Sequence, residues 1–285
     1  QASSENWYSN ETEIEMSIKD FYRDAFWPLD NEDKTDNFIY RETPSEIIKG
    51  TFNGQSGDVT TLWANQYKSI ARTNTILSNM DKAAEMGISE EKIKRYEAEA
   101  LFQRASCYAR LVTYFGDVVY VTSVVDIEEA FTLGRTPKSE IVPKIYEDYD
   151  KAAEGLPEKY TGVSSLRATK GAALALKARF ALYMGDWEIA ADAAKKCMDL
   201  GLYKLHADYA ELFLTTTKNS EESIFLLPRS IEYKVTLGNW TVMNEVSRNP
   251  GGWGAFAPSW DLLAAYECID GLPIDESPLF DPQNP

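Results

Sequence analysis

Residues 168–203, ATKGAALALKARFALYMGDWEIAADAAKKCMDLGLY, decide the fold of this chain. The stretch reads as two helices joined by a tight turn at Gly185, because the helical spacing of apolar residues is interrupted there. Thr169 is the expected N-cap of the first helix, and Asp186 is that of a second helix starting at Trp187. Alanines on facing stripes allow two antiparallel helices to approach closely, which is typical of a tetratricopeptide-like hairpin. Such a hairpin needs neighbours, since it cannot bury its apolar face alone.

Three further segments show the same helical spacing of apolar residues: 11–27, about 58–86 and about 89–115. We expect Pro28 to stop the first helix and Gly87 to end the second. Apolar residues are so dense in the second half of the third segment that this helix must be covered on most sides. These segments supply the neighbours that the hairpin requires, and they predict a mostly α-helical chain.

The charge and composition of the chain exclude several classes of protein. The formal net charge is −16 over 285 residues, and so acidic a chain repels nucleic-acid backbones and anionic lipid surfaces. No apolar run approaches the roughly 20 residues that a membrane-spanning helix needs. The sequence also lacks a phosphate-binding loop, a dinucleotide-binding glycine pattern and a G-x-S-x-G nucleophile motif. We therefore expect no nucleic-acid partner and no cofactor.

The sequence does not indicate a metal site or a catalytic site either. The single histidine, His206, lies in a segment that reads as a helix start, and one histidine cannot build a His-rich metal site. The acidic run 30–37, DNEDKTDN, lacks the spacing of a calcium-binding loop and reads as a solvated turn. Nothing in the pattern places two of the 45 acidic residues together as a glycosidase-type pair. The cysteines lack metal-ligand spacing, and we interpret them as small buried residues in helix-like segments: Cys107, Cys197 and Cys268.

Two irregular segments, 28–57 and 226–258, are the candidates for ligand binding, since both are rich in turn residues and lack a helical period. Their aromatic rings can stack on the apolar face of a sugar, while amide, guanidinium and carboxylate groups bond its hydroxyls. By contrast, Trp63, Trp187 and Trp260 lie in helical patterns, and we interpret them as core or hairpin contacts. The candidate ligand-binding residues are Trp240, Trp253, Tyr233, Asn53, Arg41 and Asp36.

A series of short motifs runs in a fixed order along residues 60–275. It begins with Trp63, Tyr67, Ile70 and Asn74, and continues with EAEALFQRA at 97–105 and FGDV at 115–118. The helix-like stretch IYEDYDKAAEGLP at 145–157, the hairpin described above and DGLPI at 270–274 follow. Together these motifs resemble the SusD/RagB family. Val119 stands where that family usually has proline, and Gln103 replaces a common leucine.

The resemblance implies a fold, a location and partners. It implies tetratricopeptide-like helix pairs that form a right-handed superhelical scaffold, with loops and small β elements on one side. It also implies a lipid-anchored protein on the outer face of the outer membrane. Such a protein would bind oligosaccharide or polysaccharide without catalysis and deliver it to a TonB-dependent SusC-like transporter. Variable loops build the glycan site in this family, so the resemblance assigns no ligand residue.

The resemblance also bears on domain organisation. We expect residues 1–285 to form a single SusD-like domain, with the helical scaffold mainly in 11–27 and 58–212. Family members usually continue into an N-R-D-P-R segment, and this chain stops where that segment would begin, so we expect it to lack the carboxy-terminal portion. It also begins without the lipoprotein signal and the acylated cysteine, so the anchor is inferred from the resemblance alone.

Two alternative functions come from other classes of protein. A tetratricopeptide-type scaffold could bind peptides in its groove, as could a SusD-like protein that captures peptides in place of glycans. A glycoside hydrolase would need two carboxylates that face each other across a cleft. Release of reducing sugar from polysaccharide would identify the hydrolase.

Overall fold

The structure is a computed structural model that describes residues 8–28, 34–41, 43–161, 167–218, 220–227, 229–232, 234–236, 239–281 and 283. Within these residues, helices dominate and the strands are short. The chain divides into two compact units. The helical unit consists of Gln1–Trp27 and Thr61–Pro228, and the loop-rich unit consists of Pro28–Thr60 and Arg229–Pro285. That residues 1–285 form a single domain stays a prediction.

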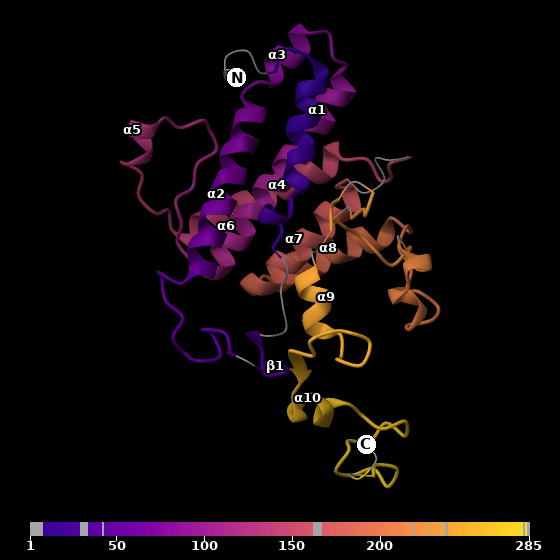
Figure 1. Ribbon diagram of the computed structural model, residues 1–285. Helices are drawn as coiled ribbons and strands as arrows, with labels where there is room; N and C mark the ends of the chain where they lie inside the picture. Colours follow the sequence, from indigo (N-terminus) through magenta and orange to yellow (C-terminus); the bar gives the residue numbers. More distant parts are fainter. Residues whose placement is uncertain are drawn as a thin grey trace. The chain divides into compact units, whose positions relative to one another are not determined.

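Pairs of neighbouring helices build the helical unit (Figure 1). The most extensive contacts join α4 to α6 and α7 to α8, and α6 also packs against α7. This arrangement confirms the prediction of a mostly α-helical fold made of tetratricopeptide-like helix pairs. The helices up to this point of the chain are α1 (Glu11–Lys19), α2 (Gly57–Leu77, whose first turn lies in the loop-rich unit), α3 (Met80–Glu85), α4 (Glu90–Phe115), the single turn α5 (Ile127–Ala130), α6 (Lys138–Gly155), α7 (Lys170–Met184) and α8 (Trp187–Asp199).

The hairpin of α7 and α8 forms as its sequence predicts, with one difference. The Thr169 hydroxyl accepts the Ala172 N–H at 3.2 Å and caps α7. Gly185 ends α7 in the left-handed conformation, with φ 81°. The Asp186 side chain, however, does not cap α8. Its carboxylate accepts the Tyr146 hydroxyl at 2.6 Å instead, so this residue ties the turn to α6.

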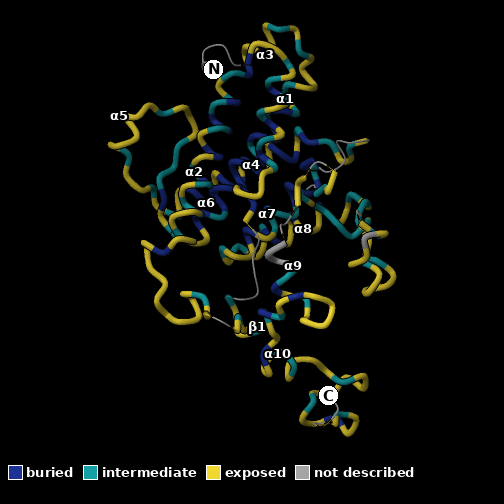
Figure 2. The backbone as a smooth tube through the Cα atoms, viewed as in Figure 1, coloured by how far each residue is buried: buried dark blue, intermediate teal, exposed yellow. Residues whose placement is uncertain are grey.

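Helix α4 is the most deeply covered element of the helical unit. Between Ala98 and Ala109 every residue except Leu101 is buried, and Figure 2 shows the helix mostly in the colour of buried residues. The Phe102 ring contacts those of Trp27 and Tyr149, with centroids 5.8 and 6.3 Å apart. Full burial of one such side chain contributes about 1.5–3 kcal/mol. The prediction that this helix is covered on most sides is therefore confirmed.

The first two predicted helices are shorter than their sequences suggest. Helix α1 ends at Lys19, and two 3₁₀ turns follow, which are separated by Arg23 in an extended conformation with ψ 145°. This change of direction buries Phe26 and Trp27, whose indole N–H donates to the Phe21 carbonyl at 2.9 Å. Helix α2 ends at Leu77, ten residues before the predicted stop, and the short helix α3 occupies most of the remainder.

Two of the tryptophans interpreted as core or hairpin contacts are exposed. Trp187 is 66% exposed and Trp260 is 80% exposed, whereas Trp63 packs against Phe115 at 5.1 Å between centroids. Each exposed tryptophan is the first residue of its helix, α8 and α10 (Trp260–Ala265) respectively. Side chains at a helix start point back past its N-terminal end, where nothing in the described residues covers these two rings. Helical spacing alone does not reveal this end effect.

The segments around His206 and Cys268 are not helical. The His206 N–H donates to the Glu222 carboxylate at 2.7 Å, so a side chain from a later segment satisfies this backbone group. Cys268 lies beyond α10, half-buried, and its N–H donates to the Leu272 carbonyl at 2.8 Å. Cys107 and Cys197 are buried in helices as predicted, and burial raises the pKa of the Cys107 thiol to about 11.

Candidate functional site

A two-stranded antiparallel sheet lies at the centre of the candidate site in the loop-rich unit. It pairs β1 (Phe38–Tyr40) with β2 (Phe256–Pro258). The pairing continues beyond the strands, since the Arg41 N–H donates to the Ala255 carbonyl at 2.9 Å. The sheet therefore brings together the two irregular segments that the sequence singles out for ligand binding.

Helix α9 (Asn239–Glu245) fixes the backbone that leads into β2. The N–H groups of residues 253–255 donate to carbonyl oxygens at the C-terminal end of α9, over 2.6 to 2.9 Å. These carbonyls have no partner within a helix, so the incoming segment satisfies them. Gly252 lies so close to this end of α9 that a Cβ at its position would clash with the backbone carbonyl of Val246. The backbone of Trp253 and of the residues on either side of it is thus held against the end of α9.

Hydrogen bonds, more than apolar packing, organise the loop-rich unit. Among its described residues, Ala255 is the single buried hydrophobic side chain, with an exposed fraction of 2%. Its other buried side chains are polar. A two-stranded sheet is marginal in isolation, so the bonds to α9 are needed to hold the strands in place.

The structure places four of the six candidate residues, and two of them lie at the same end of the sheet. Arg41 follows β1 and Trp253 precedes β2, so both lie at one end of the sheet; Trp253 is 41% exposed and Arg41 is exposed. Asp36 is exposed at the opposite end. The Asn53 amide is used within its own loop, where it accepts the Gln55 N–H at 2.9 Å and donates to the Thr51 carbonyl at 3.0 Å.

The other two candidate residues are not described by the structure in the same detail. Trp240 lies in the first turn of α9, but its side chain is outside what the structure describes. Tyr233 lies outside the described residues. Their roles stay predictions.

The end of the sheet that carries Trp253 and Arg41 combines groups suited to a polar ligand with an apolar face. The Tyr40 and Phe256 rings, which face each other across the strands at 5.1 Å, add aromatic surface nearby. The indole of Trp253 offers a flat apolar face, and the Arg41 guanidinium offers a fork of N–H donors. The sequence does not predict this ring contact, because neither segment alone indicates the register of the strands.

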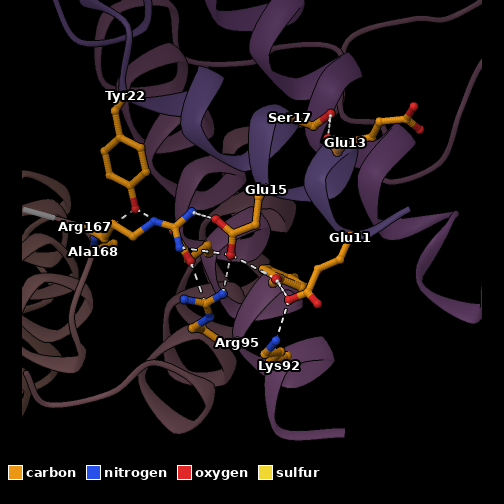
Figure 3. Close-up of polar contacts among 11 residues, drawn as sticks. Glu11, Glu13, Glu15, Ser17, Tyr22, Lys92, Arg95, Arg167 and Ala168 are labelled. Atoms are coloured by element: carbon orange, nitrogen blue, oxygen red, sulfur yellow. Dashed lines mark hydrogen bonds and ion pairs between the residues drawn. The ribbon is translucent and has the colours of Figure 1, made fainter. Parts of the chain in front are cut away.

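The helical unit contains a cluster of carboxylates that no pattern in the sequence predicts (Figure 3). Glu15 of α1 lies between two arginines, accepting from Arg167 at 2.9 Å and from Arg95 at 2.6 Å. Glu11 accepts from the Lys92 ammonium at 2.7 Å. The cluster joins α1, α4 and the segment before α7, and the chain separation of its members hides it from sequence reasoning.

Glu99 is the most buried member of this cluster, with an exposed fraction of 1%. Its carboxylate accepts the Tyr22 hydroxyl at 2.8 Å, and the Arg167 Nε atom lies 3.5 Å away. Burial raises the pKa of Glu99, although Arg167 and Tyr22 act in the opposite direction. Burial also acts to raise the pKa of Glu15, but its arginine and tyrosine partners outweigh that effect and lower it. Cations and hydroxyls engage these carboxylates and so join the helices. Among the described residues, the Glu99 Oε1 atom has no hydrogen-bond partner and lies 4.0 Å from the Arg95 Nε atom.

The described residues were compared with the requirements of metal-binding sites and of membrane-spanning helices. Within the described part of the chain, histidine, cysteine and acidic side chains form no group of three that could hold a metal ion. None of the described helices combines the length and apolar character that crossing a membrane requires.

Comparison with known proteins decides the family. A SusD-like family model, described as "Starch-binding associating with outer membrane", matches residues 8–182, which is more than half of the chain. The chain belongs to this family. SusD-like protein P2 from Formosa agariphila is 30% identical over 187 residues, which are 64% of this chain and 36% of the relative. SusD-like protein P25 from the same organism is 29% identical over 173 residues, 61% of this chain and 32% of the relative. The match thus spans about a third of each of these SusD-like relatives.

Solved structures of SusD-like proteins share the fold. A SusD-like carbohydrate-binding protein from Bacteroides fragilis superposes with a TM-score of 0.83 at 28% identity, over 96% of this chain and 57% of that one. Another SusD-like protein from B. fragilis gives a TM-score of 0.79 at 27% identity, over 95% and 55% of the two chains. These similarities confirm both the family resemblance and the helical fold that the sequence predicts.

Proposed function

We propose that this SusD-like chain binds oligosaccharide or polysaccharide at the bacterial cell surface and does not cleave it. The observation that carries the proposal is the placement of Trp253 and Arg41 at one end of the β1–β2 sheet, in a chain of the SusD-like family. The B. fragilis structure described as carbohydrate-binding, which aligns with 96% of this chain, supports the same class of ligand.

In this proposal the Trp253 indole stacks on the apolar face of a sugar ring, and the Arg41 guanidinium donates hydrogen bonds to its hydroxyls. Neither contact requires a metal ion or a perturbed pKa. The net charge of −16 does not oppose a neutral glycan, but it disfavours sulfated or uronic-rich ones. The proposed ligand is therefore a neutral glycan.

We further propose that the protein is a lipid-anchored lipoprotein of the outer membrane and delivers its glycan to a TonB-dependent SusC-like transporter. The family description, which associates its members with the outer membrane, supports this location. The helical unit would supply the rigid backing, and the loop-rich unit would grip the ligand.

The experiment combines a glycan array with affinity gel electrophoresis on the polysaccharide that the wild type retains best. We expect Trp253→Ala and Arg41→Ala each to weaken retention by about tenfold, which corresponds to a loss of about 1.4 kcal/mol. Trp187→Ala is the matched control, because this tryptophan is also exposed but belongs to the helical unit. Retention that is unchanged in both site variants would show that the site is elsewhere, and release of reducing sugar would contradict binding without catalysis.

A further inference from the structure

Three polar side-chain atoms around the carboxylate cluster are buried and have no hydrogen-bond partner among the described residues. They are Glu99 Oε1, Arg95 Nε and the Tyr160 hydroxyl oxygen. Glu99 is 1% exposed, and its other oxygen, Oε2, already accepts from the Tyr22 hydroxyl at 2.8 Å. A buried polar atom without a partner carries a desolvation penalty, which is largest for a charged group. Each of the three atoms therefore needs a partner that the described side chains do not supply.

Two of these atoms are separated by a gap that a single further atom can bridge. Arg95 and Glu99 are one turn apart on α4, and the Nε and Oε1 atoms lie 4.0 Å from each other. Hydrogen-bonded N and O atoms lie about 2.7–3.2 Å apart, so the two groups do not bond directly. Polar groups at this longer separation are typically joined through one shared partner.

The Tyr160 hydroxyl lies beside the same charged groups. Burial raises the pKa of this hydroxyl, and the charge of Glu99 raises it further, while Arg167 and Arg95 act to lower it. The interaction of two charges weakens as their separation grows, so these effects place the hydroxyl near Glu99 and both arginines. All three unpartnered atoms thus belong to one site.

The chemistry of the three atoms selects the occupant of this site. The Arg95 Nε–H can only donate a hydrogen bond, the ionised Glu99 can only accept one, and the Tyr160 hydroxyl can do either. The occupant must therefore accept from the arginine and donate to the carboxylate. A metal ion or an ammonium ion cannot accept such a bond, and a chloride ion cannot donate one. Two arginines and two glutamates meet here, so the charges balance and favour a neutral occupant.

We propose that one buried water molecule bridges Arg95, Glu99 and Tyr160. It accepts from the Arg95 Nε–H, donates to Glu99 Oε1 and shares a third bond with the Tyr160 hydroxyl. Immobilising one water costs less free energy than leaving three buried polar atoms unsatisfied. Arg95 and Glu99 belong to α4, whereas Tyr160 follows α6, so the water ties the segment after α6 to α4. The site belongs to the helical unit and does not depend on the proposed glycan binding.

The direct test is a crystal structure of the chain at a resolution that shows ordered waters. We expect a density peak within hydrogen-bond distance of Glu99 Oε1, Arg95 Nε and the Tyr160 hydroxyl. Absence of the peak, or a direct bond between Tyr160 and Glu99 in its place, would overturn the proposal. So would an anomalous signal at the peak after a bromide soak, since bromide replaces chloride but not water.

Removal of the Tyr160 hydroxyl gives a test in solution, and the sign of the effect decides it. If a water bonds the hydroxyl, Tyr160→Phe deletes a satisfied hydrogen bond, and urea unfolding should show a folding equilibrium constant about fivefold lower than wild type. If the hydroxyl has no partner, the same change removes an unsatisfied polar group, and the constant stays the same or rises. That second result would overturn the proposal.

Tyr209→Phe is the matched control for this experiment. Tyr209 is 79% exposed in the same unit, and the variant keeps the ring that contacts Phe213. It should change the folding equilibrium constant by less than about twofold, because water solvates its hydroxyl in the folded and the unfolded chain alike. An equal loss in both variants would overturn the assignment of the Tyr160 effect to a buried water.

Discussion

The buried ion pair between Arg104 and Asp148 gives the sharpest prediction about stability. The guanidinium binds the carboxylate through two bonds, Nε to Oδ2 at 2.7 Å and Nη2 to Oδ1 at 2.9 Å. Arg104 is 7% exposed and Asp148 is 5% exposed. Replacement by Arg104→Met leaves the carboxylate buried without its cation, a situation that costs about 3–5 kcal/mol. The longer bonds of Arg104, at 3.3 Å to Asn74 and 3.4 Å to the Thr122 carbonyl, add little to this figure.

The assay is urea unfolding of each variant, followed by far-UV circular dichroism. The double variant Arg104→Met/Asp148→Leu removes both charges and should recover most of the loss, because apolar side chains of similar size replace a buried ion pair at small cost. A cost below about 1 kcal/mol for Arg104→Met would mean that water reaches the pair, as it does for exposed ion pairs. A double variant as unstable as the single variant would refute the electrostatic reasoning.

Three further predictions concern the helical unit. Burial raises the pKa of Glu99 in the folded state. The unfolding free energy of wild type minus that of Glu99→Gln should therefore fall as pH rises above the ordinary glutamate pKa of about 4.3, and a difference that grows with pH in urea titrations would contradict this. Gly171→Ala would place a Cβ 2.6 Å from ring atoms of Tyr203 and should destabilise the α7–α8 hairpin by about 1–3 kcal/mol, whereas Gly134→Ala, with nothing within 4 Å, should be neutral in the same thermal melts. Trp187→Ala should change the unfolding free energy by less than about 0.5 kcal/mol, since the ring is exposed, and a larger loss would restore its interpretation as a hairpin contact.

The sequence predicted those parts of the fold that local patterns determine. The α7–α8 hairpin, the Thr169 cap and the dense covering of α4 follow from spacing and capping chemistry, and the structure confirms them. The spacing of residues did not predict the exposure of Trp187 and Trp260. A helical pattern shows which face of a helix is apolar, but not whether a neighbour extends far enough to cover its first residue.

Contacts between distant segments were the least predictable. Glu15 and Arg167 are 152 residues apart in the chain, and no pattern in one sequence pairs them. The strands β1 and β2 have three residues each, which is too short for an alternation of apolar and polar residues to be recognised. The sequence could therefore indicate which irregular segments and which kinds of side chain form the candidate site. It could not indicate the register of the strands, which places Arg41 beside Ala255 and so near Trp253.

The scarcity of apolar packing in the loop-rich unit has a consequence for how such a protein can diversify. Among the described residues of that unit, a single alanine side chain is both hydrophobic and buried. Most substitutions there leave no cavity behind, so they escape the penalty that large-to-small changes carry in a packed interior. We expect the recognition loops to tolerate new side chains, and hence new carbohydrate specificities, while the helical framework keeps its thermodynamic stability.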